Sequence, residues 1–147
     1  MLSQDYEDLF RELNAHGVKY LLVGAHAVIY YTKPRSTKDI DIWIPPELNN
    51  PNNVYTALKK YGAPLEGVSP KDFSDKKMIY QIGVAPVRVD VMMSVGDVSA
   101  VTAWKNREKS RYGKVEISIL SKKDLIQAKK KAGRPDDLMD LRKLERE

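Results

Sequence analysis

Apolar residues near the start of the chain lie at the spacing of one helix face. Four of them share this pattern: Tyr6, Leu9, Phe10 and Leu13. The spacing predicts a helix from Gln4 to Ala15, ended by Gly17. Similar patterns, caps and breaks predict further helices over 25–31, 52–61, 98–105, 121–132 and 136–146, and a single helical turn near 70–73. In the last helix we expect Leu138, Leu141 and Leu144 to face inward.

Shorter apolar runs bounded by glycine or proline predict strands. They cover residues 18–23, 36–44, 77–82, 86–92 and 114–119. Helices and strands alternate early, and a hairpin-like pair of strands follows. This order predicts an α/β (α+β) fold, in which a mixed sheet is flanked by helices and C-terminal helices follow. We expect one domain over residues 1–147, with a C-terminal helical segment from about 121 to 147.

The strand at 36–44 separates polar and apolar side chains. Side chains alternate between the faces of a strand, so Asp39 and Asp41 point the same way, about 7 Å apart. The isoleucines at 40, 42 and 44 take the opposite face. Two half-buried carboxylates on one face repel each other, and a divalent cation between them relieves that repulsion. The sequence therefore predicts a Mg²⁺ or Mn²⁺ site, with a solvent-exposed edge strand as the alternative.

A later strand, Val87–Val91, carries a third acidic residue, Asp90, among valines. If this strand pairs with the first, a strand spacing of about 4.8 Å brings Asp90 within reach of the same cation. Three carboxylates on two neighbouring strands are typical of phosphoryl or nucleotidyl transfer with two metal ions. The alternative role for Asp90 is a structural ion pair with Arg88 or Arg35.

Gly24 ends one predicted strand and begins a helix. Backbone N–H groups at such a junction bind phosphate, and glycine allows the phosphate to approach closely. A tight strand-to-helix turn explains this glycine equally well. Two aromatic side chains also have open roles: His26 either reaches a phosphate or packs, and Trp43 either stacks on a base or lies in the core.

Charge is distributed unevenly along the chain. The formal net charge is +5, but between residues 105 and 134 eleven Lys or Arg stand against three acids. A basic segment beside an acidic site indicates a polyanionic partner, although a solvated helix face gives the same pattern. The chain has no cysteine, no signal-like start and no apolar run of membrane-spanning length. We therefore expect a cytoplasmic protein with no membrane partner.

Together these motifs resemble the nucleotidyltransferase superfamily that includes DNA polymerase beta, and most of all its small AbiEii-type, toxin–antitoxin-associated branch. The resemblance rests on Gly24-Ala25, on the segment from Arg35 to Asp41, and on Asp90. Two later segments, 81–90 and 129–141, also match, so the likeness spans about residues 18–144.

This resemblance implies a role for each matching residue. Asp39, Asp41 and Asp90 would be catalytic metal ligands, and Asp90 would also activate the acceptor hydroxyl. The nucleotide triphosphate, ATP among the candidates, would contact a further set: Gly24, Ala25, Arg35, Thr37 and Lys129, with Arg134 as an additional candidate. Many members have Ser or Gly where this chain has Ala25, so the hydroxyl that helps to hold phosphate is missing here.

The resemblance implies transfer of a nucleotide monophosphate from an NTP to an acceptor hydroxyl, with release of pyrophosphate. The acceptor would be an RNA such as tRNA, a protein or a small molecule, and a cognate toxin or antitoxin would be a partner. Two alternatives remain open. One is a non-catalytic module that binds a nucleotide or a partner, which Ala25 favours. The other is a metal-dependent phosphohydrolase that uses the same carboxylates, which the Gly24 turn disfavours.

Overall fold

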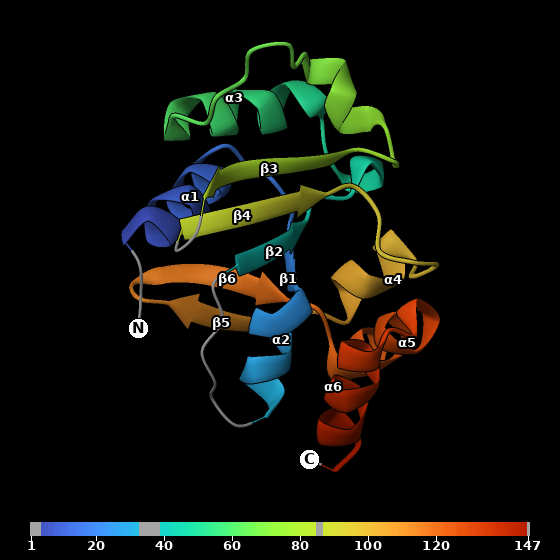
Figure 1. Cartoon of the computed structure of the whole chain (residues 1–147). Coiled ribbons are helices and arrows are strands. Elements are labelled where there is room, and N and C mark those ends of the chain that lie inside the picture. The colour runs from blue at the N-terminus through green and yellow to red at the C-terminus, as the bar shows by residue number, and fades with distance from the viewer. Residues whose placement is uncertain (1–3, 33–38, 85–86, 147) are drawn as a thin grey trace.

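Within residues 4–32, 39–84 and 87–146, which the computed structural model describes, six strands form one mixed sheet (Figure 1). The strand order is β3-β4-β2-β1-β6-β5. Parallel pairing joins β2 to β4 and β1 to β6, and the other neighbours are antiparallel. The strands are β1 (Leu21–Val23), β2 (Asp39–Trp43), β3 (Ile79–Val84), β4 (Val87–Met92), β5 (Glu108–Tyr112) and β6 (Val115–Ile119). This confirms the predicted α/β class with a mixed sheet.

Helices flank the sheet in two groups. Helix α1 packs against α3, whereas α5 packs against α6 and both contact α2. Figure 1 shows α5 and α6 as a pair beside α2, apart from α1 and α3. The helices are α1 (Gln4–Ala15), α2 (Gly24–Tyr31), α3 (Pro51–Tyr61), α4 (Ala100–Lys105), α5 (Lys122–Ala132) and α6 (Pro135–Arg146), with 3₁₀ turns η1 (Pro46–Leu48) and η2 (Pro70–Ser74). No helix in the described ranges is long and apolar enough to cross a lipid bilayer.

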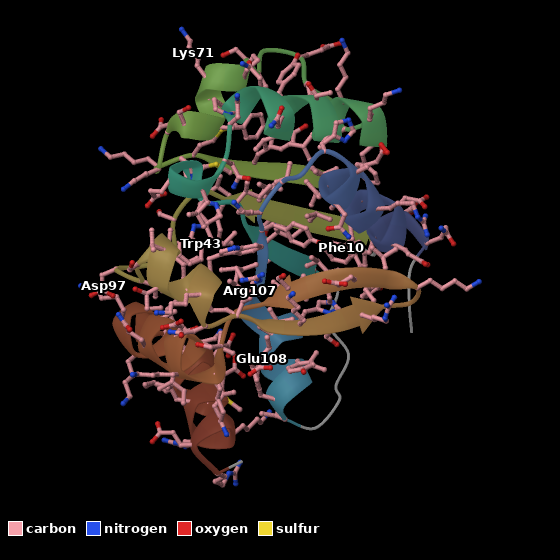
Figure 2. The ribbon with its side chains drawn as sticks, turned by 180° about the vertical axis from the view of Figure 1, so that it is seen from behind. Phe10, Trp43, Lys71, Asp97, Arg107 and Glu108 are labelled. Atoms are coloured by element: carbon pink, nitrogen blue, oxygen red, sulfur yellow. The ribbon has the colours of Figure 1, made fainter. Side chains whose placement is uncertain are left out.

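The core follows the predicted periodicities. In α1, Leu9, Phe10 and Leu13 are fully buried, and in β2 the side chains of Ile40 and Ile42 are fully buried. Figure 2 shows Phe10 and Trp43 inside the molecule, while Lys71 and Asp97 project outward. The alternation in β2 therefore buries one face in the core and leaves the aspartates on the other.

Local signals also set the helix ends. Asn50 caps α3 by accepting the backbone N–H of Asn52, and Ser121 caps α5 by accepting that of Asp124. Helix α5 ends at Gly133, which has a left-handed φ of +63°. This turn leads directly into α6, so the chain folds back and α5 and α6 lie side by side.

Two expectations about the C-terminal third were wrong. Strand β5 was not predicted, because its sequence EKSRY is almost wholly polar and only Tyr112 is buried. It forms the edge of the sheet, where pairing with β6 requires no apolar alternation. In α6, Leu138 is 47% exposed, whereas Leu141 and Leu144 are buried as expected. The inward positions beside them are instead acidic, Asp137 and Asp140.

Candidate active site

The three predicted carboxylates lie on neighbouring strands at the middle of the sheet. In the parallel pair β2 and β4, Asp39 stands opposite Arg88 and Asp41 stands opposite Asp90. On its other side, Asp41 pairs with Val23 at the end of β1. All three aspartates are partly buried. The pairing of the two acidic strands, which the sequence left conditional, is therefore present.

Gly24 brings the backbone of α2 against Asp41. Its φ of +66° lies in the left-handed region that favours glycine. A Cβ atom at this position would overlap the Asp41 Oδ2 atom and lie 2.9 Å from Cγ. Glycine is therefore needed here for two reasons, the backbone conformation and the space that Asp41 occupies. The contact with Asp41 therefore explains why position 24 is glycine more fully than a tight turn alone would.

Asp41 lies where a negative charge is disfavoured. Burial, together with the neighbouring carboxylates of Asp90 and Asp39, raises the pKa of Asp41 from 3.8 to about 6. Lys129 and Arg88 oppose this effect without cancelling it. A carboxylate held in this way gains from any cation that enters the site.

Asp90 is paired with Arg88 on the same strand. Arg88 Nε lies 3.3 Å from Asp90 Oδ1, and Arg88 Nη2 lies 3.4 Å from Oδ2. This hydrogen bond, and the charge of Asp90, raise the pKa of the Arg88 guanidinium. The ion pair with Arg88 that the sequence allowed is thus formed. It places a positive side chain beside the carboxylates.

Within the described ranges, no three His, Asp or Glu side chains are arranged to hold a metal ion. The orientations of two aspartates account for this: Asp41 turns toward Gly24, and Asp90 turns toward Arg88. The donor set still fits a hard divalent cation, because Asp39, Asp41 and Asp90 supply only oxygen ligands from adjacent strand positions.

A cavity of about 260 Å³ adjoins this site. Gly24 and Asp41 lie on one side of it, and Lys129 and Arg134 of the C-terminal helices lie on another. Its remaining wall is largely apolar and includes Val95, Leu120, Leu125 and Ala128. The cavity therefore combines a backbone turn at a helix start, an apolar surface, two carboxylates (Asp41 and Asp137) and three cations (Lys129, Lys131 and Arg134). A backbone turn, cations and an apolar surface together suit a nucleotide with its phosphates.

Lys129 was predicted to contact phosphate, but its closest partners are two acidic residues of α6. Its Nζ atom lies 3.1 Å from Asp137 Oδ1 and 3.2 Å from Asp140 Oδ2. Neither aspartate was among the predicted site residues. The sequence did carry a signal for them. Asp137 and Asp140 are three residues apart on the helix face that carries Leu141 and Leu144, and acids at inward helix positions require a partner.

The other predicted residues have different outcomes. Ala25 follows Gly24 in the first turn of α2 and is partly buried. Trp43 is 1% exposed and donates its indole N–H to the Met93 carbonyl, so it belongs to the core and does not stack on a base. His26 packs edge-to-face against Tyr6, and burial lowers its pKa. Two candidate phosphate contacts, Arg35 and Thr37, lie outside the described residues.

Known solved structures share this fold. A lincosamide antibiotic adenylyltransferase, LnuA, bound to lincomycin, is 14% identical, with a TM-score of 0.59 and coverage of 98% of this chain and 97% of that one. The antibiotic-resistance factor ANT(2'')-Ia is 10% identical (TM-score 0.62, coverage 95% and 80%). A putative nucleotidyltransferase from Thermotoga maritima is 18% identical (TM-score 0.58, coverage 97% and 94%). Identities this low establish the fold alone.

Sequence comparison identifies the family. No curated protein matches the chain. The model of a family described as "Nucleotidyl transferase of unknown function (DUF2204)" matches residues 2–147. Since that match covers all but the first residue, this protein belongs to the nucleotidyl transferase family.

Proposed function

We propose that this protein transfers a nucleotide monophosphate from an NTP to an acceptor hydroxyl and releases pyrophosphate. The observation that carries the proposal is the register of β2 and β4 beside the cavity. It sets Asp90 directly opposite Asp41 on the neighbouring strand, with Asp39 two residues before Asp41 on the same face, next to the wall formed by Gly24 and Lys129. Such a site can hold a triphosphate between carboxylate-bound cations and fixed positive groups.

In this proposal each group has a defined task. Asp39, Asp41 and Asp90 would hold Mg²⁺ or Mn²⁺, which neutralises phosphate charge and lowers the pKa of the attacking hydroxyl. Asp90 accepts the hydroxyl proton as the acceptor oxygen bonds to the α-phosphorus. The bond from the α-phosphorus to the bridging oxygen then breaks, and pyrophosphate leaves. The backbone of Gly24 and Ala25 and the ammonium of Lys129 hold the departing phosphates.

Arg35 and Thr37 remain proposed phosphate contacts on sequence grounds alone. Ala25 offers no side-chain hydroxyl, so backbone N–H groups at the start of α2 take that role. Membership of the AbiEii-type branch, a toxin or antitoxin partner and a cytoplasmic location also remain predictions.

Three acceptor classes are proposed. The basic segment between residues 105 and 134 favours RNA, although two of its cations, Lys129 and Arg134, are already paired with Asp137. The names of LnuA and ANT(2'')-Ia associate the same fold with small antibiotics, which gives reason to test a small-molecule hydroxyl. A protein side chain is the third class.

The direct test is incubation of the purified protein with each α-³²P-labelled NTP, Mg²⁺ or Mn²⁺, and total RNA, lysate protein or small hydroxyl compounds. We expect label to move to one acceptor class, with pyrophosphate released. The Asp39→Ala/Asp41→Ala variant should transfer none, and Glu66→Gln, at an exposed acid in the loop before η2, should match the wild type. Nucleotide binding without transfer in every arm would favour the non-catalytic module, and free phosphate would favour the phosphohydrolase.

Arg88→Ala is expected to tighten the binding of Mn²⁺ two- to fivefold, as measured by electron paramagnetic resonance titration without nucleotide. The variant removes the cation that pairs with Asp90 and competes for its oxygens. The expected change is small because ion pairs that reach solvent are weakened by water and by side-chain freedom. Arg11→Ala, which removes a surface arginine paired with Glu7 and Asp8, is the matched control and should leave binding unchanged. Unchanged or weaker Mn²⁺ binding in Arg88→Ala would contradict the assignment of Asp90 as a ligand.

A further inference from the structure

Helix α6 places two buried carboxylates beside Lys129, and one of them, Asp137, also lines the cavity. The side chains of Asp137 and Asp140 are 2% and 6% exposed, and Lys129 of α5, which lies between them, is 13% exposed. Burying acids is costly unless each one has partners. Both aspartates are paired with the same ammonium group, and that group also lines the cavity that contains Asp41.

We propose that Asp137 and Asp140 are positioning residues, which hold the Lys129 ammonium at the cavity wall so that it binds the triphosphate of the nucleotide. This inference rests on the proposed function and adds a role for α6. The proposed effect of both carboxylates is exerted through Lys129, and Asp140 lies outside the cavity lining.

The geometry of Lys129 supports this role. A lysine side chain has four rotatable bonds and a compact charge, so a single contact leaves the ammonium free to move. Two carboxylates, at 3.1 and 3.2 Å, restrict it to one position. An ammonium has three N–H donors, and two carboxylate contacts leave one for a ligand. Binding then costs less side-chain entropy, because the group is already ordered.

The same contacts keep Lys129 away from the acidic strands. Asp41 lines the same cavity, and the charge of Lys129 already acts on it. An unanchored ammonium would be attracted to Asp41 and compete for one of the proposed metal ligands. Anchoring on α6 therefore separates the phosphate-binding cation from the cation-binding carboxylates.

Helix packing alone does not account for these acids. Leu141 and Leu144 of α6 are buried and provide apolar contact. A buried ion pair generally contributes less to stability than apolar residues of similar volume would. Asp137 has an additional structural task, since it accepts the backbone N–H of Arg134 and pairs with its guanidinium at 2.7 Å. A substitution at Asp137 would therefore also disturb the turn at Arg134, so the test substitutes Asp140.

The experiment is a double-mutant cycle on nucleotide binding. Calorimetry measures the dissociation constant of α,β-methylene ATP, which cannot release pyrophosphate, for the wild type, Asp140→Asn, Lys129→Met and the double variant. We expect Asp140→Asn to weaken nucleotide binding about tenfold when Lys129 is present. In the Lys129→Met background the same substitution should weaken binding less than about twofold. Asp136→Asn, at an exposed acid in the same helix, is the matched control and should bind as the wild type does.

Two further measurements make the outcome decisive. Asp140→Glu retains the charge but displaces it by one methylene, so it tests the same coupling if Asp140→Asn fails to fold. Thermal unfolding of every variant confirms that the compared proteins are folded. An equal loss of binding with and without Lys129, or no loss at all, would overturn the positioning role while leaving the proposed function intact. If the wild type binds no nucleotide, both proposals fail.

Discussion

Asp41→Asn is expected to lower nucleotidyl transfer by about 10³-fold and, at the same time, to make the fold more stable at neutral pH. The loss follows from the proposed role of Asp41 as a metal ligand beside the phosphate cavity. A catalytic cation supplies several kcal/mol of charge stabilisation in the transition state, and each 1.4 kcal/mol is a factor of ten in rate. Asparagine keeps the shape of the side chain but removes the charge.

The gain in stability follows from the raised pKa of Asp41. Burial and the carboxylates of Asp90 and Asp39 raise that pKa from 3.8 to about 6. The folded protein therefore binds this proton more tightly than the unfolded chain does. Stability from this group is fully present below about pH 4 and is lost as the pH rises through about 6. Above that pH, the ionised side chain lowers the free energy of unfolding by about 3 kcal/mol.

Urea denaturation in EDTA from pH 4 to 8 measures the gain in stability. The transfer assay measures the loss of activity. The free energy of unfolding of Asp41→Asn should be near that of the wild type at pH 4 and about 3 kcal/mol higher at pH 7.5, which is a shift of about 10 °C in Tm. Added Mn²⁺ should narrow the difference by stabilising only the wild type. Glu66→Gln serves as the control in both assays. Equal stability at pH 7.5 would show that Asp41 is not in a repulsive environment.

Gly24→Ala is expected to reduce transfer at least 10²-fold and to destabilise the fold by about 2–5 kcal/mol. A non-glycine residue in the left-handed region costs about 1–2 kcal/mol. The added methyl group also overlaps the Asp41 carboxylate, and overpacking costs about 1–3 kcal/mol. Asp41 must turn away, and small displacements of a catalytic group cost about 10² in rate.

Gly17→Ala is the matched control for this variant. Gly17 has nearly the same φ, +67°, but an added Cβ there meets nothing within 4 Å. The Gly17→Ala variant should lose only about 1–2 kcal/mol of unfolding free energy, from the strained backbone, and keep full transfer activity. Denaturation and transfer assays on both variants separate the backbone effect from the contact with Asp41. Equal activity of the two variants would contradict a role for Gly24 in placing Asp41.

Most expectations that depend on local periodicity were confirmed, because the repeat of a helix or strand decides which side chains share a face. The helix Gln4–Ala15 has the predicted bounds, and Ile40 and Ile42 are buried opposite the aspartates. The exception is Leu138, which was expected to face inward and is exposed. Strand parity left Trp43 open between base stacking and the core, and the structure places it in the core, where its indole N–H donates to the Met93 carbonyl.

Local sequence was enough to predict all the helices and every strand except β5, the shared face of Asp39 and Asp41, and the turn at Gly24, since each depends on neighbouring residues. The pairing of β2 with β4, which places Asp90 opposite Asp41, and the contacts of Asp137 and Asp140 with Lys129 became known from the folded chain alone. Strand pairing and helix docking join residues that are distant along the chain. They depend on how the whole core packs, and no local pattern encodes that.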